Sequence, residues 1–154
     1  MILNMAQAYS KELSTRLRTV LDTIVGELDL SYGWMDGGCL ILTQALVSWG
    51  EGAIKAGGAL RVSSRGKSFL DHAFAHALNP VSLMRVLIDG DGLQSERFMV
   101  KKLRPLAPST CHYLSFTDCS KYAVGVPKNR AVSQYILTRL RADLGPFSAR
   151  NLFV

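Results

Sequence analysis

The segment Leu40–Trp49 is apolar on nearly every side, so a helix formed by it has to be buried against other elements. Asp36-Gly37-Gly38-Cys39 comes directly before it, and the two glycines allow a tight turn that places Cys39 at the start of this helix. Unpaired N–H groups and the positive end of the helix dipole favour a thiolate there. Such a position lowers a thiol pKa from about 8.5 to roughly 3.5–7.5. Cys39 is therefore either an activated nucleophile or a small packing residue behind the turn.

Length and composition predict one domain over residues 1–154, because 48% of the 154 residues are hydrophobic and can form a sizeable core. The apolar run is too short to span a membrane, so no membrane partner is expected. The N-terminus lacks the pattern of a signal peptide. The three cysteines have no disulfide-framework spacing. They favour a reducing, cytoplasmic setting, with export by a route that needs no signal peptide as the alternative.

The positive charge is concentrated in the second half of the chain. Residues 1–77 carry seven basic and seven acidic side chains, whereas residues 78–154 carry eleven and five, which accounts for the whole net charge of +6. This asymmetry is typical either of an anionic partner, such as nucleic acid, acidic protein or phosphate, or of a solvated basic face. No aromatic-rich strand accompanies these charges to stack on bases.

Apolar spacing, capping residues and stop signals predict the main elements. Helices are expected over residues 4–27, Leu40–Trp49, Glu96–Leu103 (capped by Ser95) and Arg130–Leu144 (capped by Asn129). Gly50–Gly58 is expected to be a loop, and short strands are expected at Ala59–Ser63, His112–Thr117 and Tyr122–Val126. The mixture predicts an α+β fold.

A hairpin is predicted around the turn Asn79-Pro80-Val81-Ser82, which has Asn at the first and Pro at the second position of a type I turn. If His72–Leu78 and Leu83–Asp89 pair across it, His72 lies directly opposite Asp89. A helix over Ser68–Leu78 is the competing interpretation, because the segment opens like a capping box and contains three alanines. We adopt the hairpin, since the β-rich second strand and the His72–Asp89 opposition favour it.

Cys39, His72 and Asp89 then form a candidate nucleophile, base and orienting carboxylate. The imidazole takes the thiol proton, and the carboxylate holds the imidazole in the right tautomer. The backbone N–H groups of Gly38 and Cys39 are candidate oxyanion donors, a contribution of roughly 3–4 kcal/mol. Asp91 is the alternative orienting carboxylate, although a residue just past a strand end more often satisfies turn amides.

These residues resemble the papain-like superfamily of cysteine peptidases, including its NlpC-like and transglutaminase-like branches of phage- and toxin-associated type. The resemblance covers about residues 31–94 and rests on Gly37-Gly38-Cys39, on His72 within Asp71–Phe74 and on Asp89 within Ile88–Gly92. It implies N-terminal helices, one led by the nucleophile, packed on a small antiparallel sheet. It also implies a hydrolase or acyl-transferase without a cofactor, acting on amide, isopeptide or related acyl bonds of a protein or peptide-like substrate.

The sequence departs from the papain pattern before and after the cysteine. The family's oxyanion glutamine, six residues before the cysteine, is replaced by Gly33, and the aromatic residue that often follows the cysteine is replaced by Leu40. Tyr32 is a candidate substitute for the missing support. A non-catalytic interaction or inhibitor module, or a nucleic-acid-binding domain using the basic half, is the alternative function.

Metal binding is not expected from the histidine and cysteine spacing. His72 and His76 lie one helical turn apart in a helix but about 13 Å apart on a strand, too far to share an ion. Asp89-Gly90-Asp91-Gly92 lacks the later ligands of a calcium loop. Cys111-His112 with Cys119 does not have the spacing of a zinc site.

Overall fold

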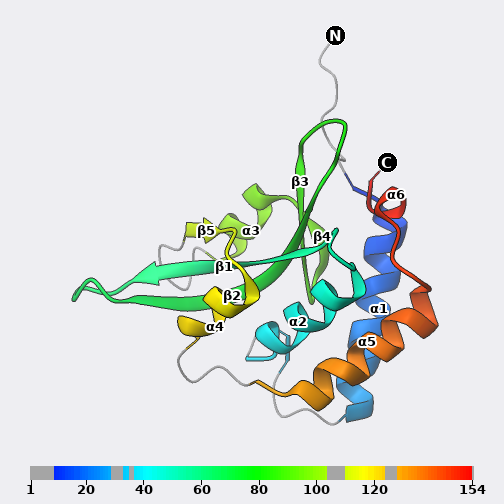
Figure 1. Cartoon of the computed structure of the whole chain (residues 1–154), viewed down its shortest axis with the longest axis horizontal. Coiled ribbons are helices and arrows are strands. Elements are labelled where there is room, and N and C mark those ends of the chain that lie inside the picture. The colour runs from blue at the N-terminus through cyan, green and yellow to red at the C-terminus, as the bar shows by residue number, and fades with distance from the viewer. Residues whose placement is uncertain (1–8, 29–32, 35–36, 104–109, 124–127, 154) are drawn as a thin grey trace.

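The computed structural model describes residues 9–28, 33–34, 37–103, 110–123 and 128–153. Within these residues the fold is α+β, with six helices and a five-stranded antiparallel sheet in the order β4-β3-β2-β1-β5 (Figure 1). The helices are α1 (Lys11–Leu28), α2 (Cys39–Trp49), α3 (Glu96–Leu103), α4 (Phe116–Lys121), α5 (Arg130–Leu144) and α6 (Ala149–Leu152). The strands are β1 (Lys55–Val62), β2 (Ser68–Leu78), β3 (Arg85–Asp89), β4 (Gly92–Gln94) and β5 (Thr110–His112).

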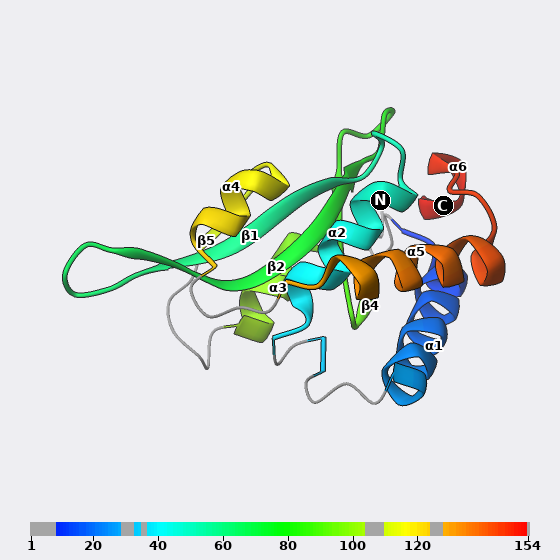
Figure 2. The same ribbon diagram turned by 60° about the horizontal axis from the view of Figure 1, so that its bottom comes forward.

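The two faces of the sheet pack against different helices, because successive side chains of a strand point to opposite faces. Ala75 and Ala77 of β2 share a core cluster with α1, α2 and α5, which gather on one side of the molecule in Figure 2. Phe74 of β2 belongs to a second cluster with Met99 and Leu103 of α3. The small alanines let the helices approach closely, while α3 covers the face that carries the larger side chains.

The predicted central helix is confirmed, and α2 begins at Cys39 itself. Gly37 has a φ of +116°, a conformation that side chains other than glycine rarely adopt, and it forms the turn into the helix. Most of α2 is buried, including Leu40, Leu42 and Leu46, each of which contributes about 1.5–3 kcal/mol by burial. The sulfur is therefore carried by an element whose position the core fixes.

The hairpin interpretation is confirmed and the helical alternative over Ser68–Leu78 is wrong, but the register differs from the prediction by two residues. Leu78 pairs with Arg85 and Ala75 with Ile88, so His72 does not lie directly opposite Asp89. The Asn79 carbonyl accepts a hydrogen bond from the N–H of Leu83 at 2.9 Å. Residues 79–84 therefore form the connection, two more than predicted. A shift of two leaves every side chain on its expected face.

The predictions for the loop after α2 and for the two strands after residue 110 are partly wrong. Strand β1 begins at Lys55, inside the predicted loop Gly50–Gly58. The predicted strand His112–Thr117 is replaced by β5 and by α4, whose N-cap Ser115 accepts a hydrogen bond from the N–H of Asp118. Of the predicted strand Tyr122–Val126, residues 122 and 123 are not in a strand and the rest lies outside the described residues.

The remaining helix predictions are mostly confirmed, α3 and α5 with the predicted bounds and caps. The predicted helix at residues 4–27 corresponds to α1, which begins at Lys11; residues 1–8 lie outside the described part. The short helix α6 was not predicted. None of the helices in the described part of the chain is both long and apolar enough to cross a membrane.

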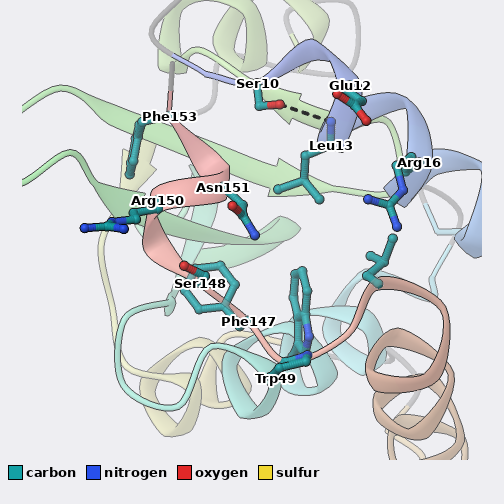
Figure 3. A pocket seen from close by; sticks show the side chains of 12 residues that line it. Ser10, Glu12, Leu13, Arg16, Trp49, Phe147, Ser148, Arg150, Asn151 and Phe153 are labelled. Atoms are coloured by element: carbon teal, nitrogen blue, oxygen red, sulfur yellow. Dashed lines mark hydrogen bonds between the residues drawn. The ribbon is translucent and has the colours of Figure 1, made fainter.

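A cavity of about 380 Å³ separates the start of α1 from the C-terminal segment (Figure 3). The ring of Trp49 lines it and packs edge-to-face against Phe147, with ring centres 5.1 Å apart. The N–H of Ser10 donates to the carbonyl of Leu152 at 2.8 Å, which ties the two segments together. Trp49 is the last residue of α2, about 15 Å along the helix from its first residue. The cavity therefore lies at the end of α2 that is remote from Cys39.

Gly90 supplies a test of the packing behind β3. A Cβ at this position would lie 2.4 Å from the Cβ of the buried Trp34. The indole N–H of Trp34 donates to the carbonyl of Leu21, which restrains the ring. We expect Gly90→Ala to lower the free energy of unfolding by about 2–3 kcal/mol, measured by urea denaturation, because of this overlap.

The matched control is Gly26→Ala, in the interior of α1, where an added Cβ has no atom within 4 Å. That substitution is expected to raise the free energy of unfolding by about 0.5–1 kcal/mol, because alanine loses less backbone entropy in a helix. Equal effects of the two substitutions would contradict the close packing of Gly90 on Trp34.

Candidate active site

Three buried polar side chains lie near the start of α2, next to the strands β2 and β3. Cys39 is the first residue of α2, His72 lies on β2, and Asp89 is the last residue of β3. Their exposed fractions are 4%, 1% and 2%. The imidazole Nε2 of His72 and the carboxylate Oδ2 of Asp89 lie 2.8 Å apart. His72 and Asp89 are therefore in direct contact, and Cys39, from a third element, is near enough to His72 for each to shift the pKa of the other.

His72 reaches Asp89 diagonally across the two strands. Ala75 pairs with Ile88, so the next residue of β3, Asp89, falls opposite Phe74. His72 lies two residues before Phe74 on the same face of β2, which makes it a diagonal neighbour of Asp89. A diagonal neighbour is still within reach of a long side chain. Asp71, just before His72, is the extra residue of a β-bulge against β1. Bulges re-aim the adjacent side chain, which helps to direct the imidazole toward the carboxylate.

The carboxylate of Asp89 accepts four hydrogen bonds from residues that the structure describes. Oδ1 accepts from the amide Nε2 of Gln94 at 2.6 Å and from the backbone N–H of Asp91 at 2.9 Å. Oδ2 accepts from the ammonium Nζ of Lys102 at 2.7 Å as well as from His72. Burial raises the pKa of Asp89, but His72 and Lys102 outweigh it and lower the pKa to about 2. Asp89 is thus a fixed anion.

Asp91, the alternative orienting carboxylate, contacts Lys102 rather than His72. Its carboxylate oxygen lies 2.9 Å from Nζ of Lys102, and the side chain is 53% exposed. Its backbone N–H donates to Asp89, as expected for a residue just past a strand end. Asp89 is therefore the carboxylate that orients the imidazole.

The imidazole of His72 is held in its charged form. Burial lowers its pKa, but the hydrogen bond and charge of Asp89 and the neighbouring Cys39 raise it to about 9. Asp89 occupies Nε2, and Nδ1 is buried without a hydrogen-bond partner among the described residues. Nδ1 is therefore the ring nitrogen free to exchange a proton with the thiol. This arrangement keeps a positive charge beside the sulfur over the neutral pH range.

The Cys39 thiol is shifted in the opposite direction. Burial raises its pKa, but the neighbouring His72, together with the backbone N–H groups of Ala73 and Leu40, brings it below the usual value. The other two cysteines differ, since burial raises the pKa of both Cys111 and Cys119 to about 11. Among the three thiols, that of Cys39 is the one prepared to ionise.

Comparison of the chain with family models, curated proteins and solved structures gives no match. The interpretation of the site accordingly depends on its geometry and electrostatics.

The oxyanion prediction needs a correction at Gly38. Its N–H donates to the carbonyl of Gly33 at 3.0 Å, so this donor is engaged in the turn. The N–H of Cys39 is the first of α2 and has no acceptor within the helix. Tyr32, the predicted substitute support, lies outside the described residues.

Gln94 and Lys102 were not predicted to belong to the site. The tight turn Gly90-Asp91 between β3 and β4 pairs Leu87 with Gln94, and Gln94 therefore points to the same face as Asp89. A two-residue hairpin at a Gly-Asp pair is a recognisable signal that could have placed Gln94. Lys102 reaches Asp89 from α3, and no local sequence pattern indicates that contact.

His76 remains separate from the candidate triad. Its Nε2 bonds to the carbonyl of Ala56 at 2.9 Å, and burial and the charge of Arg85 lower its pKa to about 4. His76 and His72 do not share a ligand position. Over the described part of the chain, no three histidine, cysteine, aspartate or glutamate side chains gather as metal ligands would.

Proposed function

We propose that this protein is a cysteine hydrolase or acyl-transferase with a papain-like arrangement, acting on an amide or related acyl bond. The observation that carries the proposal is the buried hydrogen bond between His72 and Asp89 next to Cys39. In this arrangement the thiol pKa is lowered and the imidazole pKa is raised. A packing cysteine needs neither a buried cation nor an orienting carboxylate. The order of nucleophile on a helix, then base and carboxylate on successive strands, supports the same class.

In the proposed reaction His72 takes the thiol proton and the Cys39 sulfur attacks the carbonyl carbon of the substrate. The carbonyl oxygen becomes an oxyanion, for which the N–H of Cys39 is a donor. The tetrahedral intermediate collapses as the bond to the leaving group breaks, and His72 gives its proton to that group. A thioester on Cys39 remains.

The second half of the reaction releases the acyl group. Water, or an amine acceptor in a transferase, attacks the thioester carbon while His72 removes a proton from it. The C–S bond then breaks, and the proton returns to the Cys39–His72 pair. Asp89 keeps the imidazole in position throughout, held in turn by Gln94 and Lys102.

An activated ester tests this proposal without knowledge of the natural substrate. We expect p-nitrophenyl acetate at pH 7 to give a burst of p-nitrophenolate equivalent to the protein present, because deacylation of a thioester is slower than its formation. Mass spectrometry of the peptides is expected to place the acetyl group on Cys39.

Cys111→Ser and Cys119→Ser are the matched controls, and both are expected to keep the burst because their thiols have raised pKa values. Cys39→Ser is expected to lose it. Acetylation spread equally over the cysteines, or no burst from the folded protein, would instead favour a non-catalytic interaction module.

A further inference from the structure

Lys102 forms an ion pair with the candidate catalytic carboxylate of Asp89. Its Nζ lies 2.7 Å from Oδ2 of Asp89, the same oxygen that pairs with Nε2 of His72, and 2.9 Å from Oδ2 of Asp91. The Lys102 side chain is 18% exposed. One carboxylate oxygen thus lies between an imidazole and an ammonium group.

The helix that carries Lys102 is fixed on the face of the sheet where His72 and Asp89 lie. Met99 and Leu103 of α3 are 0% and 2% exposed and pack against Phe74 and Leu87. The hydroxyl of Ser95 accepts a hydrogen bond from the N–H of Phe98 and caps the helix. Lys102 is therefore delivered by a packed element, unlike a surface lysine on a loop.

We propose that Lys102 is a positioning residue for the candidate triad, holding Asp89 in place and setting the pH range over which Cys39 and His72 carry opposite charges. This inference rests on the proposed function of Cys39. Lys102 does not touch the reacting atoms and acts through Asp89.

The positive charge of Lys102 is expected to lower the pKa values of both Cys39 and His72. The polar groups facing Asp89 are His72 on β2, the Asp91 amide in the turn, Gln94 on β4 and Lys102 on α3. Arg18 of α1 packs against the neighbouring Gly92. Removing a nearby positive charge favours every protonated form, so both the thiol and the imidazole then hold their protons to higher pH. A purely structural lysine would leave both titrations unchanged.

The experiment is the pH dependence of Cys39 alkylation by iodoacetamide in Lys102→Met. A thiolate–imidazolium pair gives a first rise when the thiol ionises, a plateau, and a second rise when the imidazole loses its proton. We expect both rises to move upward by about one pH unit, which is about a tenfold slower reaction on the first rise. Lys102→Arg keeps the charge and is expected to restore the wild-type profile.

Lys101→Met is the matched control. Lys101 is the preceding residue of α3, is exposed, and makes no ion pair with any residue that the structure describes. Lys101→Met removes the same charge from the same helix but breaks no ion pair with Asp89. Its pH profile of Cys39 alkylation is therefore expected to coincide with that of the wild type. Coinciding profiles for the two methionine variants would overturn the proposal.

An NMR titration of His72 tests the role of Lys102 independently of the function proposed for Cys39. A wild-type protein in which Cys39 ionises at no lower pH than Cys111 and Cys119 would contradict the proposed function alone. The pKa of His72, followed through its ring carbon shift, still has to increase in Lys102→Met and return in Lys102→Arg. An unchanged His72 titration in folded Lys102→Met would overturn the role of Lys102 whatever Cys39 does.

Discussion

Replacing His72 by alanine is expected to slow the alkylation of Cys39 by iodoacetamide at pH 6 by about 100-fold. Without the imidazolium, burial raises the thiol pKa as it does for the other two cysteines, and the thiolate fraction falls by several powers of ten. The greater nucleophilicity of a more basic thiolate recovers part of that loss. Quantitative mass spectrometry of the three cysteine peptides measures each rate in one sample.

His76→Ala is the matched control for this prediction. His76 lies on the same strand and face as His72 and is similarly buried, but it bonds to the carbonyl of Ala56. We expect its loss to leave the rate of Cys39 alkylation within about twofold of the wild type, because its ring does not contact the thiol. If wild-type Cys39 reacted no faster than Cys111, the catalytic interpretation would fail.

The second large effect is expected in the pH dependence of stability, where Cys39 and His72 act in opposite directions. The raised pKa of His72 contributes stability that is complete below its unfolded pKa of 6.5 and is lost as the pH rises through about 9. The lowered pKa of Cys39 contributes stability that is complete above its unfolded pKa of 9.0 and is lost as the pH falls through the folded value.

Between pH 6.5 and 9 these two contributions cancel in the wild type wherever the pH is above the folded pKa of Cys39. There the folded pair holds one proton on the imidazole, and the unfolded pair holds one on the thiol, so the pair adds no slope. In Cys39→Ala the pKa of His72 is still raised by Asp89, so the folded imidazole holds its proton to higher pH than the unfolded one. We expect the stability of Cys39→Ala relative to wild type to fall with rising pH by up to about 1.4 kcal/mol per unit.

Urea unfolding at a series of pH values from 6.5 to 8.5 measures this difference. The background of all other titrating groups is common to both proteins and cancels in the comparison. Parallel curves for the wild type and Cys39→Ala would mean that the sulfur is protonated in the folded state. Cys119→Ala, which removes a buried thiol with a raised pKa, is expected to give such a parallel curve.

Local patterns predicted the elements whose signals are strong within a few residues. The uncharged segment Leu40–Trp49 and the Asn129 cap of α5 needed no tertiary information. The strand β2 was predicted from the β-rich segment that follows it, and it forms despite its alanines because both of its faces are covered. Helix propensity was overridden there by packing on two sides.

Other features depend on contacts between distant segments and left no local trace. The connection of residues 79–84 is lengthened by hydrogen bonds of Asn79 to Leu83 and Met84, which a standard turn pattern does not foresee. Strand β5 exists because residues 110–112 pair with β1, about 50 residues earlier in the chain. The contact of Lys102 with Asp89 arises only after α3 has packed on the sheet.

The sheet order has a consequence for when during folding the candidate site becomes reactive. Strands β1 to β4 are neighbours both along the chain and in the sheet, so base and carboxylate meet through short-range pairing, which forms early. The nucleophile arrives separately, when α2 docks against β2. A nascent or partly folded chain is therefore expected to carry an ordinary, unreactive cysteine, and activation of the thiol is tied to completion of the core.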